Sequence, residues 1–176
     1  MVEATLMAIS LMWLPVGLLL LGIGEAKGTG ALVIMVGALV LVSAVIQAAV
    51  FKDPWIASLL FAYGLFYAIV GYSLFAGLEN LKAAGNASFT LIPISIVYVI
   101  FALTGGPVLE GGKQLIGKSN FLALACAGYT VLYVMVWLNA YGKFSAKTLG
   151  VSLIIWTVVG LWLPAFWLLA KGTLPF

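Results

Sequence analysis

The chain has 176 residues, of which 65% are hydrophobic and 7% are charged, and it contains no histidine. A soluble domain is about half apolar and about a quarter charged. The charges are too few to cover a water-soluble particle of this size, so the composition excludes a soluble enzyme, a DNA-binding domain and a secreted disulfide-rich protein. The net charge of +3 comes from scattered lysines, so no basic patch for nucleic acid is expected.

Six long apolar segments follow one another, separated by short polar connections. They cover approximately residues 4–23, 30–51, 55–77, 87–104, 121–141 and 149–170. Each is close to the ~20 residues that a helix needs to cross ~30 Å of hydrocarbon. A β-barrel is disfavoured, because its strands are about half as long and alternate in polarity. The sequence therefore predicts an all-α, polytopic membrane protein: one compact six-helix bundle formed by a single domain over residues 1–176.

The charged residues all lie in the connections or near a terminus, so no charged side chain lies in the middle of a predicted span. Short connections favour antiparallel neighbouring helices and place both termini on the same side of the membrane. The sequence does not determine which side this is, because the lysines divide equally between the two sides and the positive-inside rule therefore gives no orientation. Glu3 stands where a signal peptide would be basic, so the first segment is interpreted as a membrane span.

The missing residue types restrict the chemistry. Proton relays and ion-coupling sites within membranes are built from Asp, Glu, His, Lys or Arg inside the spans. The single Cys126 allows no intramolecular disulfide and no cysteine-based metal site, and no phosphate-binding loop or carboxylate pair is visible. We therefore expect no enzymatic activity, no cofactor and no metal, and passive movement of a neutral solute is favoured over active transport.

Aromatic residues make up 13% of the chain and carry the positive indication of function. Tyr129 and Tyr133 are four residues apart in the fifth segment and share one helical face, as Tyr63 and Tyr67 do in the third. A phenol buried in hydrocarbon needs a hydrogen-bond partner, which a solute in a pore or a neighbouring helix could supply. From spacing alone, pore lining and core packing both stay open.

Other polar and helix-breaking residues interrupt the spans. Gln47 and Asn139 could each join two helices by a hydrogen bond, which is the favoured interpretation, or contact a solute. Pro15, Pro93 and Pro164 lie inside predicted spans, where each can kink its helix.

Several short blocks resemble the AmiS/UreI family of urea and short-chain amide channels. They are Val36-Gly37-Ala38-Leu39, Leu59-Leu60-Phe61, Tyr67-Ala68, Tyr129-Thr130-Val131-Leu132-Tyr133, Gly142-Lys143-Phe144 and, as the strongest block, Trp162-Leu163-Pro164-Ala165-Phe166-Trp167-Leu168-Leu169. The length of the chain, its number of spans and its short loops also agree with this family over nearly the whole chain.

The resemblance implies a six-helix protomer with its own pore, and a ring-shaped homo-hexamer of such protomers. The hexamer would lie in the plasma (inner) membrane, in contact with membrane lipid. The resemblance also implies termini outside, and the loops with Lys27, Lys82 and Lys143 in the cytoplasm. A narrow aromatic-lined pore would pass urea or a short-chain amide by facilitated diffusion. The pore-lining residues that it implies are Trp13, Phe61, Leu65, Tyr129, Tyr133 and Trp156.

The sequence also departs from the family pattern. Val16-Gly17 stands where Asn-Gly is common, Gly71 replaces a polar Asn, and Trp156 lies near the position of a carboxylate in some members. The expected pore is thus less polar than a urea-selective one, and histidine-based acid gating is not expected. An acetate/succinate uptake channel, whose chains share a Tyr-Gly pair like Tyr63-Gly64, and a non-transporting scaffold stay open as alternatives.

Overall fold

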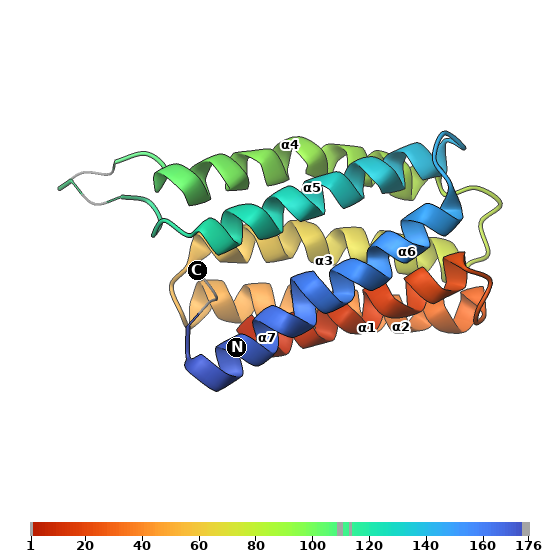
Figure 1. Ribbon diagram of the computed structural model, residues 1–176, viewed down its shortest axis with the longest axis horizontal. Coiled ribbons are helices and arrows are strands. Elements are labelled where there is room, and N and C mark those ends of the chain that lie inside the picture. The colour runs from red at the N-terminus through yellow and green to blue at the C-terminus, as the bar shows by residue number, and fades with distance from the viewer. Residues whose placement is uncertain (1, 109–110, 113, 174–176) are drawn as a thin grey trace.

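Six antiparallel spans form one helical bundle in the computed structural model, which describes residues 2–108, 111–112 and 114–173 (Figure 1). They are α1 (Val2–Leu20), α2 (Ala26–Ala49), α3 (Pro54–Phe75), α4 (Lys82–Thr104), α5 (Asn120–Ala140) and the continuous run of α6 (Ala146–Trp156), η1 (Thr157–Trp162) and α7 (Leu163–Lys171). All six are long and apolar enough to cross a membrane. The predicted all-α, multi-pass membrane architecture is confirmed.

Helix starts follow local capping more closely than the ends of the apolar runs. Asp53 accepts a backbone hydrogen bond from the first turn of α3, and Ser119 and Ser145 do the same for α5 and α6. Such caps satisfy backbone N–H groups that have no partner within the helix. Helices α2 and α4 begin at Ala26 and Lys82, before the predicted spans at residues 30 and 87.

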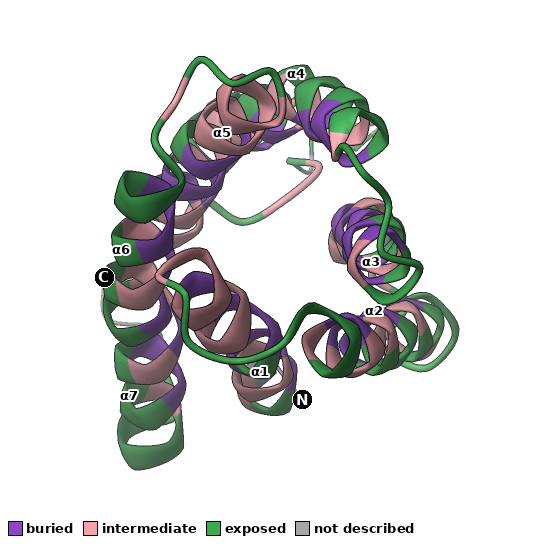
Figure 2. Cartoon of the chain, turned by 90° about the vertical axis from the view of Figure 1, so that its right-hand side faces the viewer, coloured by how far each residue is buried: buried purple, intermediate pink, exposed green. Residues whose placement is uncertain are grey.

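Viewed along the helices, the spans form a ring whose buried residues turn inward (Figure 2). The outer surface carries large exposed apolar side chains on every span. Examples are Leu11, Met35, Tyr72, Phe89, Val131 and Phe166. An apolar exterior is expected of helices that are surrounded by lipid.

Helices α2 and α3 pack backbone against backbone. A Cβ atom added at Gly30 would lie 2.7 Å from Gly71 O, and one added at Gly37 would lie 3.0 Å from Gly64 O. Small residues at such positions allow membrane helices to approach closely. Gly71, one of the departures from the family pattern, therefore has a packing role between these two helices.

The last span is not a regular α-helix. A π-helical segment, η1, precedes Pro164, which lacks a backbone N–H and whose ring crowds the preceding turn. The wider π turn accommodates the proline while the span continues. Helices α1 and α4 instead run uninterrupted through Pro15 and Pro93.

The two ends of the bundle hold different connections. The start of α1 and the end of α7 lie at one end, with the α2–α3 connection and the end of α4 (Figure 1). We call this the terminal end. The α1–α2, α3–α4 and α5–α6 connections lie at the other end, which we call the opposite end.

Candidate functional site

Aromatic side chains from three helices meet inside the ring. They are Trp13 of α1, Tyr63, Phe66 and Tyr67 of α3, and Tyr129 and Tyr133 of α5, and all are buried. The ring centroids lie 4.8 Å apart for Trp13 and Tyr129, and 4.9 Å apart for Tyr63 and Tyr129. Those of Phe66 and Tyr133 are separated by 5.2 Å. These are contact distances, so the rings form one continuous group, which we call the aromatic cluster.

A cavity of about 310 Å³ lies between the aromatic cluster and the terminal end. Tyr63 and Tyr129 form its inner wall, and apolar residues such as Ile9 and Leu59 line its sides. The polar side chains in its lining include Thr5, Gln47, Asp53, Ser119 and Cys126. We call it the wide cavity.

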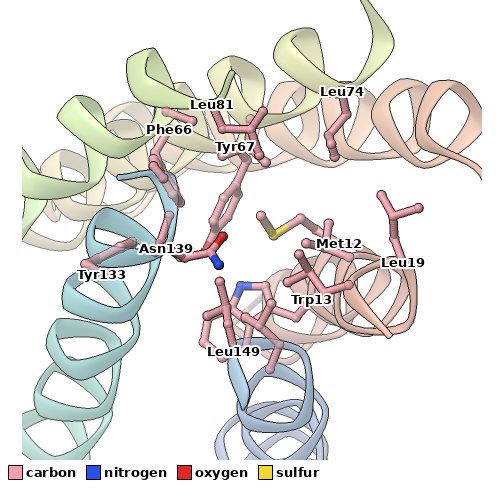
Figure 3. A pocket seen from close by; sticks show the side chains of 17 residues that line it. Met12, Trp13, Leu19, Phe66, Tyr67, Leu74, Leu81, Tyr133, Asn139 and Leu149 are labelled. Atoms are coloured by element: carbon pink, nitrogen blue, oxygen red, sulfur yellow. The ribbon is translucent and has the colours of Figure 1, made fainter. Parts of the chain in front are cut away.

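A smaller cavity of about 80 Å³ lies between the aromatic cluster and the opposite end (Figure 3). Trp13, Phe66, Tyr67 and Tyr133 of the cluster line it, with aliphatic side chains around them. Figure 3 shows the Asn139 amide extending toward the same space from α5. We call it the narrow cavity, and its volume suits a solute of a few heavy atoms.

The hydroxyl groups of Tyr67 and Tyr133 are buried and have no hydrogen-bond partner among the described residues. Leaving a buried hydroxyl unpaired costs about 1–3 kcal/mol. Both residues line the narrow cavity, although their two oxygens are themselves fully buried. A small shift of a ring would bring its hydroxyl to water or a solute in this cavity. Few polar groups converging in a mostly apolar cavity are typical of a small-molecule site.

Three of the six residues expected to line a pore come together inside the ring. Trp13 lines the narrow cavity, Tyr129 lines the wide cavity and Tyr133 lines the narrow one. The centroids of Tyr129 and Tyr133 are 6.2 Å apart, so the shared helical face expected for these two residues is present.

Phe61 and Leu65 lie on the outside of α3, 51% and 45% exposed. They line a shallow surface groove between α2 and α3 and are not brought to the aromatic cluster. The face of α3 that turns inward is the face of Tyr63 and Tyr67, 3% and 1% exposed. Packing selects this face because the tyrosine rings fill the space opposite α5.

Trp156 lies behind α5 and outside the described lining of the two cavities. Its indole ring packs against Gly128 of α5 and against Gly160, where an added Cβ atom would lie 2.8 Å from Trp156 Cε3. Gly128 directly precedes Tyr129, so Trp156 backs the helix segment that presents this tyrosine. The structure therefore places Trp156 between α5 and the last span and apart from the described lining of both cavities.

Gln47 and Asn139 bond to the connection that follows their own helix. Gln47 Nε2 donates to Asp53 Oδ2 at 3.5 Å, and Asn139 Nδ2 donates to the Phe144 carbonyl at 2.9 Å. Each also lines a cavity, Gln47 the wide one and Asn139 the narrow one. Neither bond joins the bodies of two helices as expected: Gln47 bonds to Asp53, the residue that caps α3, and Asn139 bonds to the α5–α6 connection.

Sequence reasoning missed Phe66 altogether. It lies three residues after Tyr63 and directly before Tyr67, and its side chain is 4% exposed. Residues at spacings of three and four belong to one helical face, so the Tyr63-Phe66-Tyr67 pattern could have identified it.

The whole fold is similar to a solved structure. The crystal structure of the urea channel from the human gastric pathogen Helicobacter pylori matches with a TM-score of 0.79, covering 98% of this chain and 99% of that chain at 19% sequence identity. The chain has the urea-channel fold. The six-helix fold expected from the AmiS/UreI resemblance is thereby confirmed. No family model matches the sequence, and no curated protein matches it.

Proposed function

We propose that this chain is a passive channel for small neutral amides, including urea. The observation that carries the proposal is the pair of unpartnered hydroxyl groups, Tyr67 Oη and Tyr133 Oη, on two residues that line the narrow cavity. The urea-channel fold supports the same solute class, because the solved protein is a urea channel.

The proposed pathway runs from the wide cavity, through the aromatic cluster, to the narrow cavity. Trp13, Tyr129 and Tyr133 would line it as expected from the sequence, and Tyr63 and Tyr67 would join them. The rings are in contact, so a solute must displace them slightly as it passes. A flat amide suits this passage, because its face can stack on the rings that it separates.

The wall of this pathway favours neutral solutes over ions. The described residues that line the narrow cavity include no charged side chain. An ion there would lose hydration at a cost of several kcal/mol. An amide loses less, because the hydroxyl groups of Tyr67 and Tyr133 can replace part of its water.

The aliphatic wall of the narrow cavity favours amides that carry a short alkyl group. Met12, Val16, Leu149 and Leu153 belong to this wall. A methyl or ethyl group gains by leaving water for such a surface, at ~0.8 kcal/mol per buried CH₂. A second NH₂ group, as in urea, finds fewer polar partners there. We therefore propose that acetamide and propionamide permeate at least as well as urea.

We further propose that the protein is a ring-shaped hexamer in the plasma membrane, with both termini outside and the wide cavity opening outward. The outward face of α3, with Phe61 and Leu65, would then contact lipid or a neighbouring protomer. Cross-linking in membranes, combined with the mass of the detergent-solubilised particle, tests the assembly. A particle that remains monomeric at all protein concentrations would contradict it.

Stopped-flow light scattering of proteoliposomes tests the function. The vesicles are challenged in turn with urea, acetamide, propionamide, acetate and glycerol, and protein-free vesicles serve as the control. Accelerated amide or urea flux supports the proposal. Flux of acetate alone would indicate an acetate/succinate uptake channel, and no accelerated flux would indicate a scaffold.

A further inference from the structure

Tyr63 differs from Tyr67 and Tyr133 in having a partner for its hydroxyl group. Its Oη lies 2.9 Å from Ser95 Oγ of α4, and both side chains are buried, Ser95 at 0% exposure. This hydrogen bond joins α3 to α4 across 32 residues of sequence. The phenol of Tyr63 is thereby directed toward α4, while its ring remains in the aromatic cluster.

The Tyr63 ring lies in the proposed pathway where the wide cavity meets the aromatic cluster. Its centroid is 4.9 Å from that of Tyr129 and 5.5 Å from that of Tyr133. It also forms part of the inner wall of the wide cavity. The orientation of this ring therefore sets the space between α3 and α5 through which a solute would leave the wide cavity.

Ser95 is the group that fixes this orientation. Without its hydroxyl, Tyr63 Oη would lose the 2.9 Å bond and keep only its interactions with Cys126 and Tyr133, which is unfavourable for a buried phenol. The wide cavity borders the same ring and can hold water. The phenol would then turn toward the cavity and narrow the gap to Tyr129.

We propose that Ser95 is a positioning residue that sets the size selectivity of the channel by holding Tyr63 back from the pathway. This inference rests on the proposed function. It assigns a role in selectivity to a residue on α4 that lines neither cavity among the described residues.

Ser88 provides a matched control on the same helix. It is also 0% exposed, and its Oγ also bonds to another helix, donating to the Tyr133 carbonyl at 2.7 Å. That carbonyl belongs to the backbone of α5, which the helix itself holds in place, so loss of the bond leaves the Tyr133 ring where it is. Both Ser→Ala substitutions remove one buried interhelical hydrogen bond, but one of them releases an aromatic ring.

The experiment compares the permeability ratio of propionamide to urea in proteoliposomes of four proteins: wild type, Ser95→Ala, Ser95→Thr and Ser88→Ala. We expect Ser95→Ala to lower the ratio about fivefold, the factor that corresponds to a typical net hydrogen bond. Ser95→Thr keeps the hydroxyl and should retain the wild-type ratio. Ser88→Ala should retain the ratio, even if it lowers the unfolding temperature as much as Ser95→Ala does.

Tyr63→Phe gives a second route if Ser95→Ala folds poorly. Since Ser95 and Tyr63 act through one bond, adding Ser95→Ala to Tyr63→Phe should change the ratio no further. Equal changes in the Ser95→Ala and Ser88→Ala proteins, or an unchanged ratio in Ser95→Ala, would overturn the positioning role while the channel function stands. Absence of amide and urea flux in the wild type would instead overturn the channel function, and the selectivity role with it.

Discussion

The two cavities differ in how their polar groups are used. In the wide cavity, Asp53 accepts bonds from Ile56 N and Gln47, and Ser119 accepts one from Leu122 N. In the narrow cavity, Tyr67 Oη and Tyr133 Oη are unpartnered among the described residues. The larger cavity thus has polar groups that already serve the fold, whereas two of the tyrosines lining the smaller one have hydroxyl groups without a partner. On the proposed function, this difference in hydrogen-bonding capacity, rather than volume, makes the wide cavity a vestibule and the narrow cavity the binding site.

The largest effect is expected from removing both unpartnered hydroxyl groups. The double substitution Tyr67→Phe/Tyr133→Phe should lower amide permeability about 30-fold, corresponding to two hydrogen bonds of ~1 kcal/mol each. The unfolding temperature in detergent should stay the same or rise, because no bond within the protein is lost. The two readouts are stopped-flow flux and thermal unfolding.

Tyr98→Phe is the matched control for this double substitution. Tyr98 Oη donates to the Trp55 carbonyl at 2.8 Å, and Tyr98 lies outside the described lining of both cavities. This variant should lose stability and keep its permeability. If the double variant instead loses stability and keeps its permeability, the narrow cavity is a packing defect and not a site.

Partly filling each cavity with a larger side chain from its own wall should lower the amide permeability by unequal amounts. Ala84 lines the narrow cavity and Ala125 lines the wide one. Substitution by Leu adds the same carbon atoms to both, but they occupy a much larger share of 80 Å³ than of 310 Å³. We expect Ala84→Leu to reduce amide permeability about tenfold and Ala125→Leu less than about twofold, as a steric effect of filling a closely packed space.

The purified variants are compared by flux per inserted protein, with circular dichroism confirming helix content. Equal reductions in Ala84→Leu and Ala125→Leu would show that both cavities limit permeation. The contrast between vestibule and site would then be lost.

Asp53 should prove to be structural. Its carboxylate caps α3, and Asn is about as good a cap as Asp, whereas Ala is not. Asp53→Ala should therefore lower the free energy of unfolding by ~1 kcal/mol, while Asp53→Asn changes it little. Neither substitution should alter amide permeability. A large permeability change in Asp53→Asn, with stability intact, would assign a solute contact to the wide cavity.

The smallest effect is expected from ion gradients. The described spans offer no carboxylate or amine in the lining of the narrow cavity that could couple solute movement to an ion. Collapsing a proton or sodium gradient with ionophores should leave the amide flux within about twofold, since no ion-binding group is available there. Flux that vanishes with the gradient would contradict a passive channel.

Some features of the site were accessible from the sequence and others were not. Spacing alone placed Tyr129 and Tyr133 on one face, because a helix has a fixed period. The same period allowed two faces of α3, and the family resemblance implied the face of Phe61 and Leu65 instead of that of Tyr63 and Tyr67. Both faces are apolar, so hydrophobicity cannot tell the inside of a membrane bundle from its lipid-facing side.

Trp156 illustrates a second limit. Its place in the last span is visible in the sequence, but its packing depends on Gly128, 28 residues earlier, and on the π-helical turn before Pro164. The contact with Gly128 joins α5 to the last span, and a local helical pattern carries no information on such a contact.

The sequence by itself determined that a lipid bilayer surrounds the chain and that its spans are α-helices. Apolar segments of bilayer length require helices, because hydrocarbon offers no hydrogen-bond partners for free backbone groups. The sequence also determined that the predicted spans contain no charged side chain. Only the tertiary structure decided which aromatic rings meet, which hydroxyl groups are bonded and which are left open in a cavity. Those properties arise from contacts between α1, α3, α4 and α5 that are distant in sequence, and a local pattern carries no information on them.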